Sequence, residues 1–453
     1  MKYKDLTEGP IFKRLFEYSI PIVVTNVVQL LFHAADVAVL SLMVDDAAVA
    51  AVGACGSIIT LLVSLFTGFA TGANVLVSKK TGAKCEQEVK QASGTALMLG
   101  LISGIVLMVF AVIFAKRILI LANCQPDVLE MATVYMRIYF LGMPITMLYN
   151  FASAVLRATG DSFRPMIFIN VSGVLNVLLN VMLIGWLHMT VEGVALATVA
   201  SKLVALVMIL VTMAKKNCIC RIERKNLRIR KNELFEIVRV GVPTCMTSLF
   251  FYVANVVLGA QVNSMGTDAM TANAISGQFD GVIYTVGCAI AMGTAAMVGQ
   301  NFGARRLDRI QKTMKVSALF VTSVSLALGI SFVMLSEPLL GMMTRRESVI
   351  EIAKERMTLL CLTYFVTSNM ELMAFSLRAL RRHKVTMYVG AVCGFGIRVF
   401  WALLIWPLHP TLPMLYTCFS VSAAIACGIY FAVYRRTVRA LKREFSGDVL
   451  HPV

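Results

Sequence analysis

The segment GANVLVSKKTGA at residues 72–83 has a second version, GTAAMVGQNFGA, at residues 293–304. Both glycines and the final alanine keep their places, and the offset is 293 − 72 = 221 residues. VLRATGDSFRPM from Val155 pairs with SLRALRRHKVTM from Ser376 at the same offset (376 − 155 = 221), and the segments around Pro21 and Pro243 pair at 243 − 21 = 222, which one inserted or deleted residue accounts for. Three pairs in one register indicate that about half of the chain was duplicated.

The composition is that of a protein that crosses a membrane many times. Hydrophobic residues make up 58% of the 453 residues, and the mean hydropathy is +0.77. Soluble domains contain about 45–50% apolar residues. The net charge of +17 would suggest nucleic acid in a soluble protein. Here the cations lie between hydrophobic runs, which favours loops that meet anionic lipid, and no nucleic-acid partner is expected.

Twelve runs are apolar enough to span a bilayer, which takes about 20 residues each. Six lie in each half, so the sequence predicts an all-α polytopic membrane protein built from two six-helix repeats. The predicted lobes are residues 1–214 and 235–435, joined by a basic linker at 215–234 and followed by a tail at 436–453. The runs are 14–41, 49–77, 92–115, 128–155, 165–187, 191–213, 236–263, 269–298, 314–336, 349–377, 386–408 and 411–434.

Lysine and arginine are distributed unequally between the two sets of loops, which predicts the orientation. The linker alone contains eight cations from Lys215 to Lys231, and the opposite loops contain only Lys116, Arg117, Arg345 and Arg346. Both termini and the linker are therefore expected in the cytoplasm. An even number of spans in each half makes the two repeats parallel. The linker is expected to be a solvated connector.

Several motifs resemble the multidrug and toxic compound extrusion (MATE) transporters. They are the duplicated glycine segment, the run YMRIYFLGMPITMLYNFASAVLRATGDSFRPM at 135–166, and LNVLLNVMLIGWLHMTVEGVALATVAS at 175–201. The resemblance extends from about residue 10 to residue 435. It implies two six-helix bundles arranged as a V around a central cavity. It also implies export of amphipathic, often cationic, organic compounds by alternating access, driven by protons or sodium.

Asp36 is the first candidate for ion coupling, because an ionisable residue at bilayer depth is costly and is by default a candidate functional residue. It lies in the outer half of the first run and matches the position of an acidic residue linked to coupling in this family. A buried carboxylate is costly unless a cation compensates, so protonation or ion binding would change its hydrogen bonds. Pro21 lower in the same run supplies a bend. A structural polar contact remains the alternative.

Three further polar residues of the first lobe are assigned to ion coupling. Asn176 and Asn180 lie one turn apart in the fifth run, and much of the family has an aspartate near Asn180. An amide there can coordinate an ion or bind Asp36 but cannot carry a proton, which leaves Asp36 as the titrating acid. Lys202 in the sixth run is expected to pair with an acid, to replace a coupling ion, or to extend to an aqueous cavity.

In the second lobe, two departures from the family argue against the sodium site of some members. Tyr252 stands near the position of their glutamate and Thr367 near that of their aspartate. Glu371, one turn beyond Thr367, is the repeat partner of Asn150 (371 − 150 = 221). Glu371 could be a displaced coupling acid or could recognise cationic substrates. Glu371 and Asn150 are assigned to substrate binding, as are Tyr252 and the remaining candidates Tyr139, Tyr149, Asn255, Gln278 and Phe279. Asp280, Arg398 and Arg137 are expected to be solvated or paired.

Two alternatives stay open. A flippase of lipid-linked sugars belongs to the same superfamily, but would need a more basic cavity and often has further spans. A polytopic membrane enzyme would need a buried catalytic cluster, and the five histidines are scattered. The eleven cysteines have no metal-ligand spacing. The sequence thus predicts a non-enzymatic, monomeric exporter of the bacterial inner membrane. No cofactor is expected beyond the coupling ion, H⁺ or Na⁺, and protons are favoured over sodium.

Overall fold

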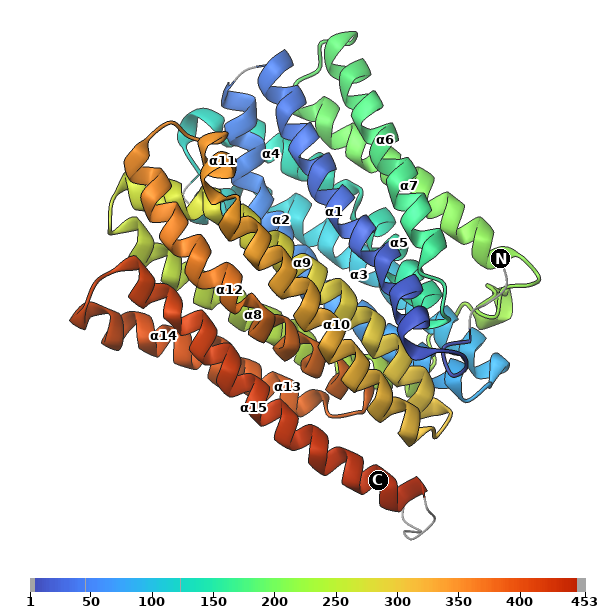
Figure 1. The fold of residues 1–453 in the computed structure, drawn as a ribbon. Coiled ribbons are helices and arrows are strands. Elements are labelled where there is room, and N and C mark those ends of the chain that lie inside the picture. The colour runs from blue at the N-terminus through green and yellow to red at the C-terminus, as the bar shows by residue number, and fades with distance from the viewer. Residues whose placement is uncertain (1–4, 45, 123, 446–453) are drawn as a thin grey trace. The chain divides into compact units, whose positions relative to one another are not determined.

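The computed structural model describes residues 5–44, 46–122 and 124–445, and this part of the chain is helical with connecting loops and no strand (Figure 1). The all-α prediction is confirmed. The first seven helices are α1 (Ile11–Met43), α2 (Asp46–Gly82), α3 (Glu86–Leu121), α4 (Pro126–Leu141), α5 (Met143–Ala158), α6 (Phe163–Gly185) and α7 (Val191–Ala214). The others are α8 (Lys231–Asn263), α9 (Thr267–Gly303), α10 (Leu307–Met334), α11 (Ser336–Gly341), α12 (Glu347–Ala379), α13 (His383–Val389), α14 (Arg398–Phe400) and α15 (Leu412–Phe445).

Ten helices of the described chain are long and apolar enough to cross a membrane, and the bent pair α4 and α5 counts as an eleventh. Helix α1, which carries the first predicted run, is 33 residues long. The predicted run 128–155 is broken rather than continuous, with a bend of 48° between α4 and α5. Gly142 and Pro144 explain the break, because proline lacks the amide hydrogen and its ring clashes with the preceding turn.

The predicted run 386–408 is irregular. After α13 it contains two π-helical segments, η2 (Gly390–Ile397) and η3 (Trp401–Ile405), separated by α14 and followed by the 3₁₀ turn η4 (Trp406–Leu408). Hydrophobicity alone does not distinguish a π-helix from an α-helix, so the sequence did not indicate this. Figure 1 shows this stretch lying along α15.

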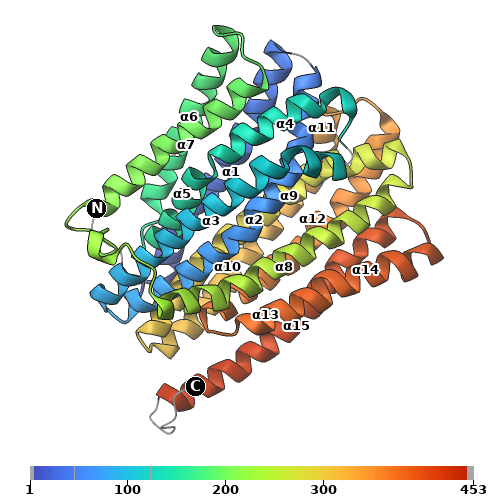
Figure 2. The same cartoon turned by 180° about the vertical axis from the view of Figure 1, so that it is seen from behind.

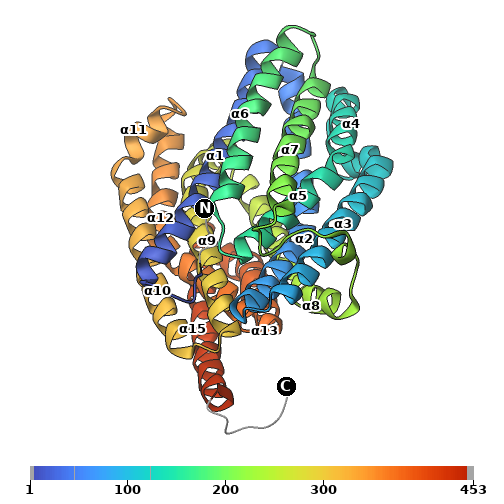
Figure 3. The ribbon, with the colours of Figure 1, turned by 90° about the vertical axis from the view of Figure 1, so that its right-hand side faces the viewer.

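The chain forms two compact units whose boundaries fall inside helices. Among the described residues, the first contains Asp5 and residues 24–245, and the second contains residues 6–23 and 246–445. These boundaries differ from the predicted lobes, because the start of α1 packs within the second unit and the start of α8 within the first. Leu15 and Ile22 of α1, for example, lie in a buried cluster with Met297 of α9. In the first unit, α6 and α7 lie side by side (Figure 3).

The duplicated glycine segment explains how these crossing helices are held. A Cβ atom on Gly72 of α2 would lie 2.3 Å from the carbonyl oxygen of Ile237 in α8. A Cβ atom on its repeat partner Gly293 in α9 would lie 2.4 Å from Ser19 Oγ in α1. Only glycine permits such close helix contact. In Figure 2 the first part of α8 lies beside α2, and both belong to the first unit. The motif therefore fixes the first part of α8 in one unit and the first part of α1 in the other.

The linker between α7 and α8 packs against the first unit, so the prediction of a solvated connector is wrong. Cys220 is fully buried, and Asn226 of the 3₁₀ turn η1 (Arg224–Asn226) is 1% exposed. The Thr95 hydroxyl of α3 donates to the carbonyl oxygen of Arg228 at 3.3 Å. A hydrogen bond between the thiols of Cys218 and Cys220, 3.3 Å apart, lowers the pKa of Cys218 to about 7.

Both chain ends lie outside the described residues, which include neither 1–4 nor 446–453. The described part of the predicted tail, residues 436–445, is helical, because α15 continues to Phe445.

Candidate functional site

The Asp36 carboxylate of α1 lies against α6. Asn180 donates a hydrogen bond from Nδ2 to Asp36 Oδ1 at 2.6 Å. Asn180 is fully buried, and its Oδ1 has no hydrogen-bond partner among the described residues. The i and i+4 spacing places Asn176 one turn away on the same face of α6. The two amides and the acid that the sequence assigned to ion coupling thus lie together.

Asn176 completes this contact through the orientation of its amide. With the nitrogen directed at the acid, it donates to Asp36 Oδ1 at 2.7 Å, and its oxygen accepts from the Thr198 backbone amide at 3.2 Å. This orientation satisfies both polar atoms, so we assign it. Asp36 Oδ1 therefore accepts from two neutral amides, which stabilise the carboxylate without neutralising it.

Lys202 of α7 belongs to the same environment, and it forms no ion pair with any described side chain. Its Nζ lies 5.8 Å from the centre of the Tyr139 ring on α4, a cation–π distance. It also lies within electrostatic range of Asp36. Tyr139 is in turn 6.0 Å from the ring of Tyr135. We name Asp36, Asn176, Asn180, Lys202 and Tyr139 the Asp36 cluster.

Two other substrate-binding candidates lie in the first unit. Tyr149 is 5% exposed, and its hydroxyl donates to the carbonyl oxygen of Pro165 at 2.9 Å, which connects α5 to α6. Asn150 is half-buried on α5. The Tyr149 hydroxyl is thus engaged in a contact that holds two helices together.

The remaining substrate-binding candidates lie in the second unit. Glu371 of α12 lies near Tyr284 of α9 and within electrostatic range of Arg378 and Arg398. Phe279 packs on Phe332 with ring centres 5.5 Å apart. Tyr252 and Asn255 of α8 are half-buried, and Gln278 of α9 is exposed.

The sequence reasoning missed a buried ion pair in the second unit. Arg356 of α12 donates from one terminal nitrogen to Asp280 Oδ1 of α9 at 2.7 Å. The two residues are 8% and 6% exposed. The Tyr364 hydroxyl donates to Asp280 Oδ2 at 3.0 Å, and Arg356 also donates to Ser276 Oγ at 3.0 Å. Both oxygens of Asp280 are thereby occupied.

An aromatic ring closes this network from a third helix. The Arg356 guanidinium lies 4.7 Å from the centre of the Tyr416 ring on α15, whose hydroxyl donates to Asn273 Oδ1 at 2.6 Å. We name Asp280, Arg356, Tyr364, Ser276 and Tyr416 the Asp280 network. One sequence signal could have revealed it: Arg356 is the eighth residue of the predicted span 349–377, where a cation requires a partner.

The other charges singled out from the sequence take different places. Arg398 is 2% exposed, lies 4.4 Å from the Phe419 ring centre, and donates from Nε to Ser422 Oγ at 3.1 Å. Arg137 of α4 is exposed. Within the described residues, no group of three or more His, Cys, Asp or Glu side chains is arranged to hold a metal ion.

Comparison with known proteins matches both halves of the chain to the same family model. The MatE family model matches residues 21–182 and again residues 243–404, an offset of 243 − 21 = 222 residues that agrees with the predicted duplication. A probable multidrug resistance protein, YoeA of Bacillus subtilis (strain 168), is 25% identical over 376 residues, covering 82% of this chain and 81% of the relative. The multidrug export protein MepA of Staphylococcus aureus (strain MRSA252) is 21% identical over 346 residues, 76% of each chain.

Solved structures show the same fold. A crystal structure of a MATE protein in the bent conformation matches with a TM-score of 0.91 at 19% identity, covering 98% of this chain and 100% of that chain. An outward-facing MATE family transporter matches with a TM-score of 0.90 and covers 98% of this chain and 99% of the other. The predicted two-lobe transporter fold is confirmed.

Proposed function

The chain belongs to the MatE family of membrane transporters and is not an enzyme, and we propose that it is a secondary-active exporter of amphipathic, cationic organic compounds. The proposed driving force is a proton gradient, and the proposed cycle is alternating access. The relatives named for multidrug resistance and multidrug export support the export of varied compounds.

The observation that carries the coupling proposal is the Asp36 cluster. The Asp36 carboxylate accepts from Asn180 at 2.6 Å and has no ion pair within the described side chains. An acid inside a membrane segment with only amides in direct contact must be compensated by a proton or a cation during the cycle. Protonation removes the charge that the two amides stabilise, and so changes the attachment of α1 to α6.

Protons are proposed rather than sodium as the coupling ion because of two residues in the second unit. Tyr252 and Thr367 stand near the positions at which some sodium-coupled members of the family have acids. Lys202 supplies a resident cation within range of Asp36 and is proposed to stabilise the carboxylate after the proton has left.

The substrate class rests on different residues. Glu371 is the proposed partner of a cationic group, with Asn150, Tyr252, Gln278, Asn255, Tyr139, Tyr149 and Phe279 as further contacts. The chain contains 27 methionines and 25 phenylalanines, and flexible, polarisable methionine surfaces accommodate varied apolar shapes. We further propose a monomer in the bacterial plasma membrane with both termini in the cytoplasm, in keeping with the distribution of Lys and Arg.

The test is efflux of ethidium from cells or inverted vesicles that contain the wild type or Asp36→Asn. The substitution keeps the shape of the side chain and removes its ability to carry a proton. We expect wild-type export to follow an imposed proton gradient and the Asp36→Asn variant to lose it. Asp127→Asn is the matched control, because Asp127 is exposed in the first turn of α4, outside the Asp36 cluster, and this variant should export normally.

Other outcomes separate the parts of the proposal. Export that follows sodium instead would retain the exporter and overturn proton coupling. Normal proton-driven export by Asp36→Asn would overturn the role of Asp36. No export of several cationic dyes, with the protein present in the membrane, would contradict the substrate class and favour a lipid-linked substrate.

A further inference from the structure

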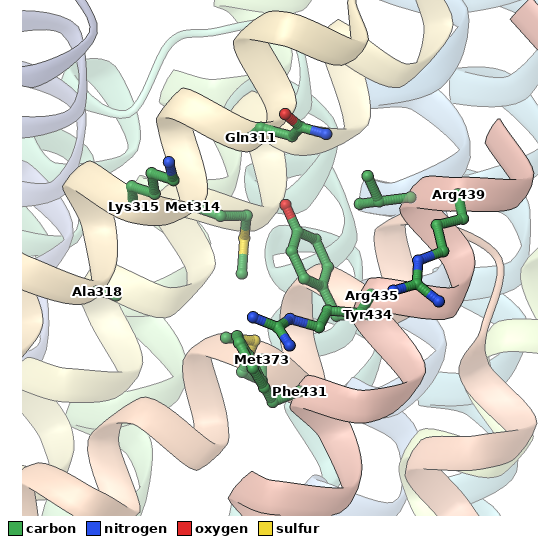
Figure 4. A pocket seen from close by; sticks show the side chains of 10 residues that line it. Gln311, Met314, Lys315, Ala318, Met373, Phe431, Tyr434, Arg435 and Arg439 are labelled. Carbon is green, nitrogen blue, oxygen red and sulfur yellow. The ribbon is translucent and has the colours of Figure 1, made fainter. Parts of the chain in front are cut away.

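A pocket of about 380 Å³ lies in the second unit between α10, α12 and α15, and its lining shares no residue with the Asp36 cluster or the Asp280 network. Figure 4 shows the lining side chains on the helices that border it. The lining combines cations with apolar groups: Gln311, Met314, Lys315, Ala318, Met373, Phe431, Tyr434, Arg435, Val438 and Arg439.

The charge of this pocket is of one sign. Lys315, Arg435 and Arg439 line it, and no aspartate or glutamate is among its lining residues. All three cations are exposed, and none forms an ion pair within the described part of the chain. Arg435 stacks on the Phe431 ring at 4.6 Å, which orients its guanidinium. Three uncompensated cations, one from α10 and two from α15, favour an anion as the ligand of this pocket.

A buried polar atom points to the same conclusion. Tyr434 is only 9% exposed, yet its hydroxyl has no hydrogen-bond partner among the described residues. In Figure 4 this hydroxyl points toward α10, between Met314 and Gln311. A buried hydroxyl without a hydrogen-bond partner lowers stability, and an oxygen-rich ligand in the pocket would supply the missing partner.

The depth of the pocket places it where lipid headgroups lie. Helix α15 has 34 residues. At 1.5 Å per residue it is about 51 Å long, whereas the hydrocarbon core of a bilayer is about 30 Å thick. About 20 residues from its start suffice to cross, so Arg435 and Arg439 come at or beyond the membrane boundary. Ala318, Met373 and Phe431 provide an apolar surface next to the cations.

We propose that this pocket binds an anionic phospholipid, with the phosphate between Lys315, Arg435 and Arg439 and an acyl chain along Met373 and Phe431. Arginine recognises phosphate through its planar fork of donors, and the Tyr434 hydroxyl supplies a further donor. A free phosphate ester would use the cations but leave the apolar side unfilled. The occupant is therefore a lipid from the bilayer. This inference requires only that the chain is embedded in a membrane, and does not depend on what it exports.

The test measures lipid binding to the purified full chain in detergent by native mass spectrometry. The probes are phosphatidylglycerol, phosphatidylcholine and glycerol 3-phosphate. The test variant is Lys315→Gln with Arg435→Gln. The control is Lys312→Gln with Arg436→Gln, which removes two exposed cations of α10 and α15 that do not line the pocket.

We expect the wild type and the control to bind phosphatidylglycerol in preference to phosphatidylcholine. The test variant should bind phosphatidylglycerol roughly 30-fold more weakly, since each cation near an anionic lipid contributes about 1 kcal/mol. Tyr434→Phe keeps the ring and should weaken binding several-fold.

Three results would overturn the proposal. Equal loss of phosphatidylglycerol binding in the control would show general attraction to a basic surface. Equal binding of phosphatidylcholine would show that the pocket does not select anions. Competition by glycerol 3-phosphate as strong as that by phosphatidylglycerol would make the ligand a soluble phosphate ester. Circular dichroism of each variant checks that it is folded.

Discussion

The two units each contain a carboxylate within a membrane-spanning helix, and they stabilise it differently. In the first unit, Asp36 accepts a hydrogen bond from the Asn180 amide at 2.6 Å. In the second, Asp280 pairs with the Arg356 guanidinium at 2.7 Å and accepts from Tyr364 at 3.0 Å. When the hydrogen-bond partner of an acid is neutral, the negative charge of the acid must be compensated by a mobile proton or cation. A guanidinium compensates it permanently.

The two acids are not repeat partners. The offset of 222 residues at the start of each half aligns Asp36 with Leu258 (36 + 222 = 258), and the offset of 221 aligns Asp280 with Ile59 (280 − 221 = 59). Each half therefore has an acid where the other has an aliphatic side chain. The duplication preserved the helices and their close glycine contacts, and the buried charges differ because each depends on partners specific to its own half.

The largest expected effect is on the Asp280 network. Arg356→Gln leaves the Asp280 carboxylate buried without its cation, which costs about 3–5 kcal/mol in the free energy of unfolding. Unfolding of the purified protein in a denaturing detergent titration measures this. The double variant with Asp280→Asn removes both charges and should recover most of the loss. If it recovers none, Arg356 does not stabilise the fold through Asp280.

A smaller effect is expected at the Asp36 cluster. Asn180→Leu keeps a similar volume but removes the donor at 2.6 Å, and should lower the free energy of unfolding by about 1–3 kcal/mol. Proton-driven export should fall more than stability does, because the amide contacts the proposed coupling acid directly. Measuring dye export per folded molecule separates the two effects. Unchanged export would remove Asn180 from the proposed coupling.

Tyrosine to phenylalanine substitutions compare single hydrogen bonds in the two units. Tyr364→Phe removes one donor to Asp280, and Tyr149→Phe removes the bond to the Pro165 carbonyl oxygen. Each should cost about 0.5–1.5 kcal/mol in the free energy of unfolding. If Tyr149 is only structural, Tyr149→Phe should leave the relative export of different dyes unchanged. A changed dye profile would support its predicted contact with substrate.

The smallest effect on stability is expected at Lys202. Lys202→Met removes the cation above the Tyr139 ring. A cation–π interaction at an exposed site contributes about 0.5–1 kcal/mol to stability. Lys202→Arg keeps the charge and should be closer to wild type. Loss of proton-driven export in Lys202→Met but not in Lys202→Arg would support the role of a resident cation near Asp36. Equal export by both variants would contradict it.

The Asp36 cluster could be anticipated because its members are rare polar residues within long apolar runs of one half. The i, i+4 spacing of Asn176 and Asn180 on one helical face made a shared contact with Asp36 a reasonable expectation. The Asp280 network was not anticipated, since Arg356 lies near the start of α12 among other charges, and its partner is 76 residues away on α9. No local pattern joins the two.

The sequence by itself determined the helical class, the runs that can span a membrane and the duplication, because hydrophobicity and internal repetition are local properties of a chain. It also identified the glycine segments, whose role at Gly72 and Gly293 is to allow close helix packing. Only the tertiary structure decided that α1 and α8 each contribute to two units, that the linker is packed, and that Arg356 compensates Asp280. These features depend on which surfaces meet, and contacts between distant segments are selected by packing and charge in three dimensions rather than by sequence period.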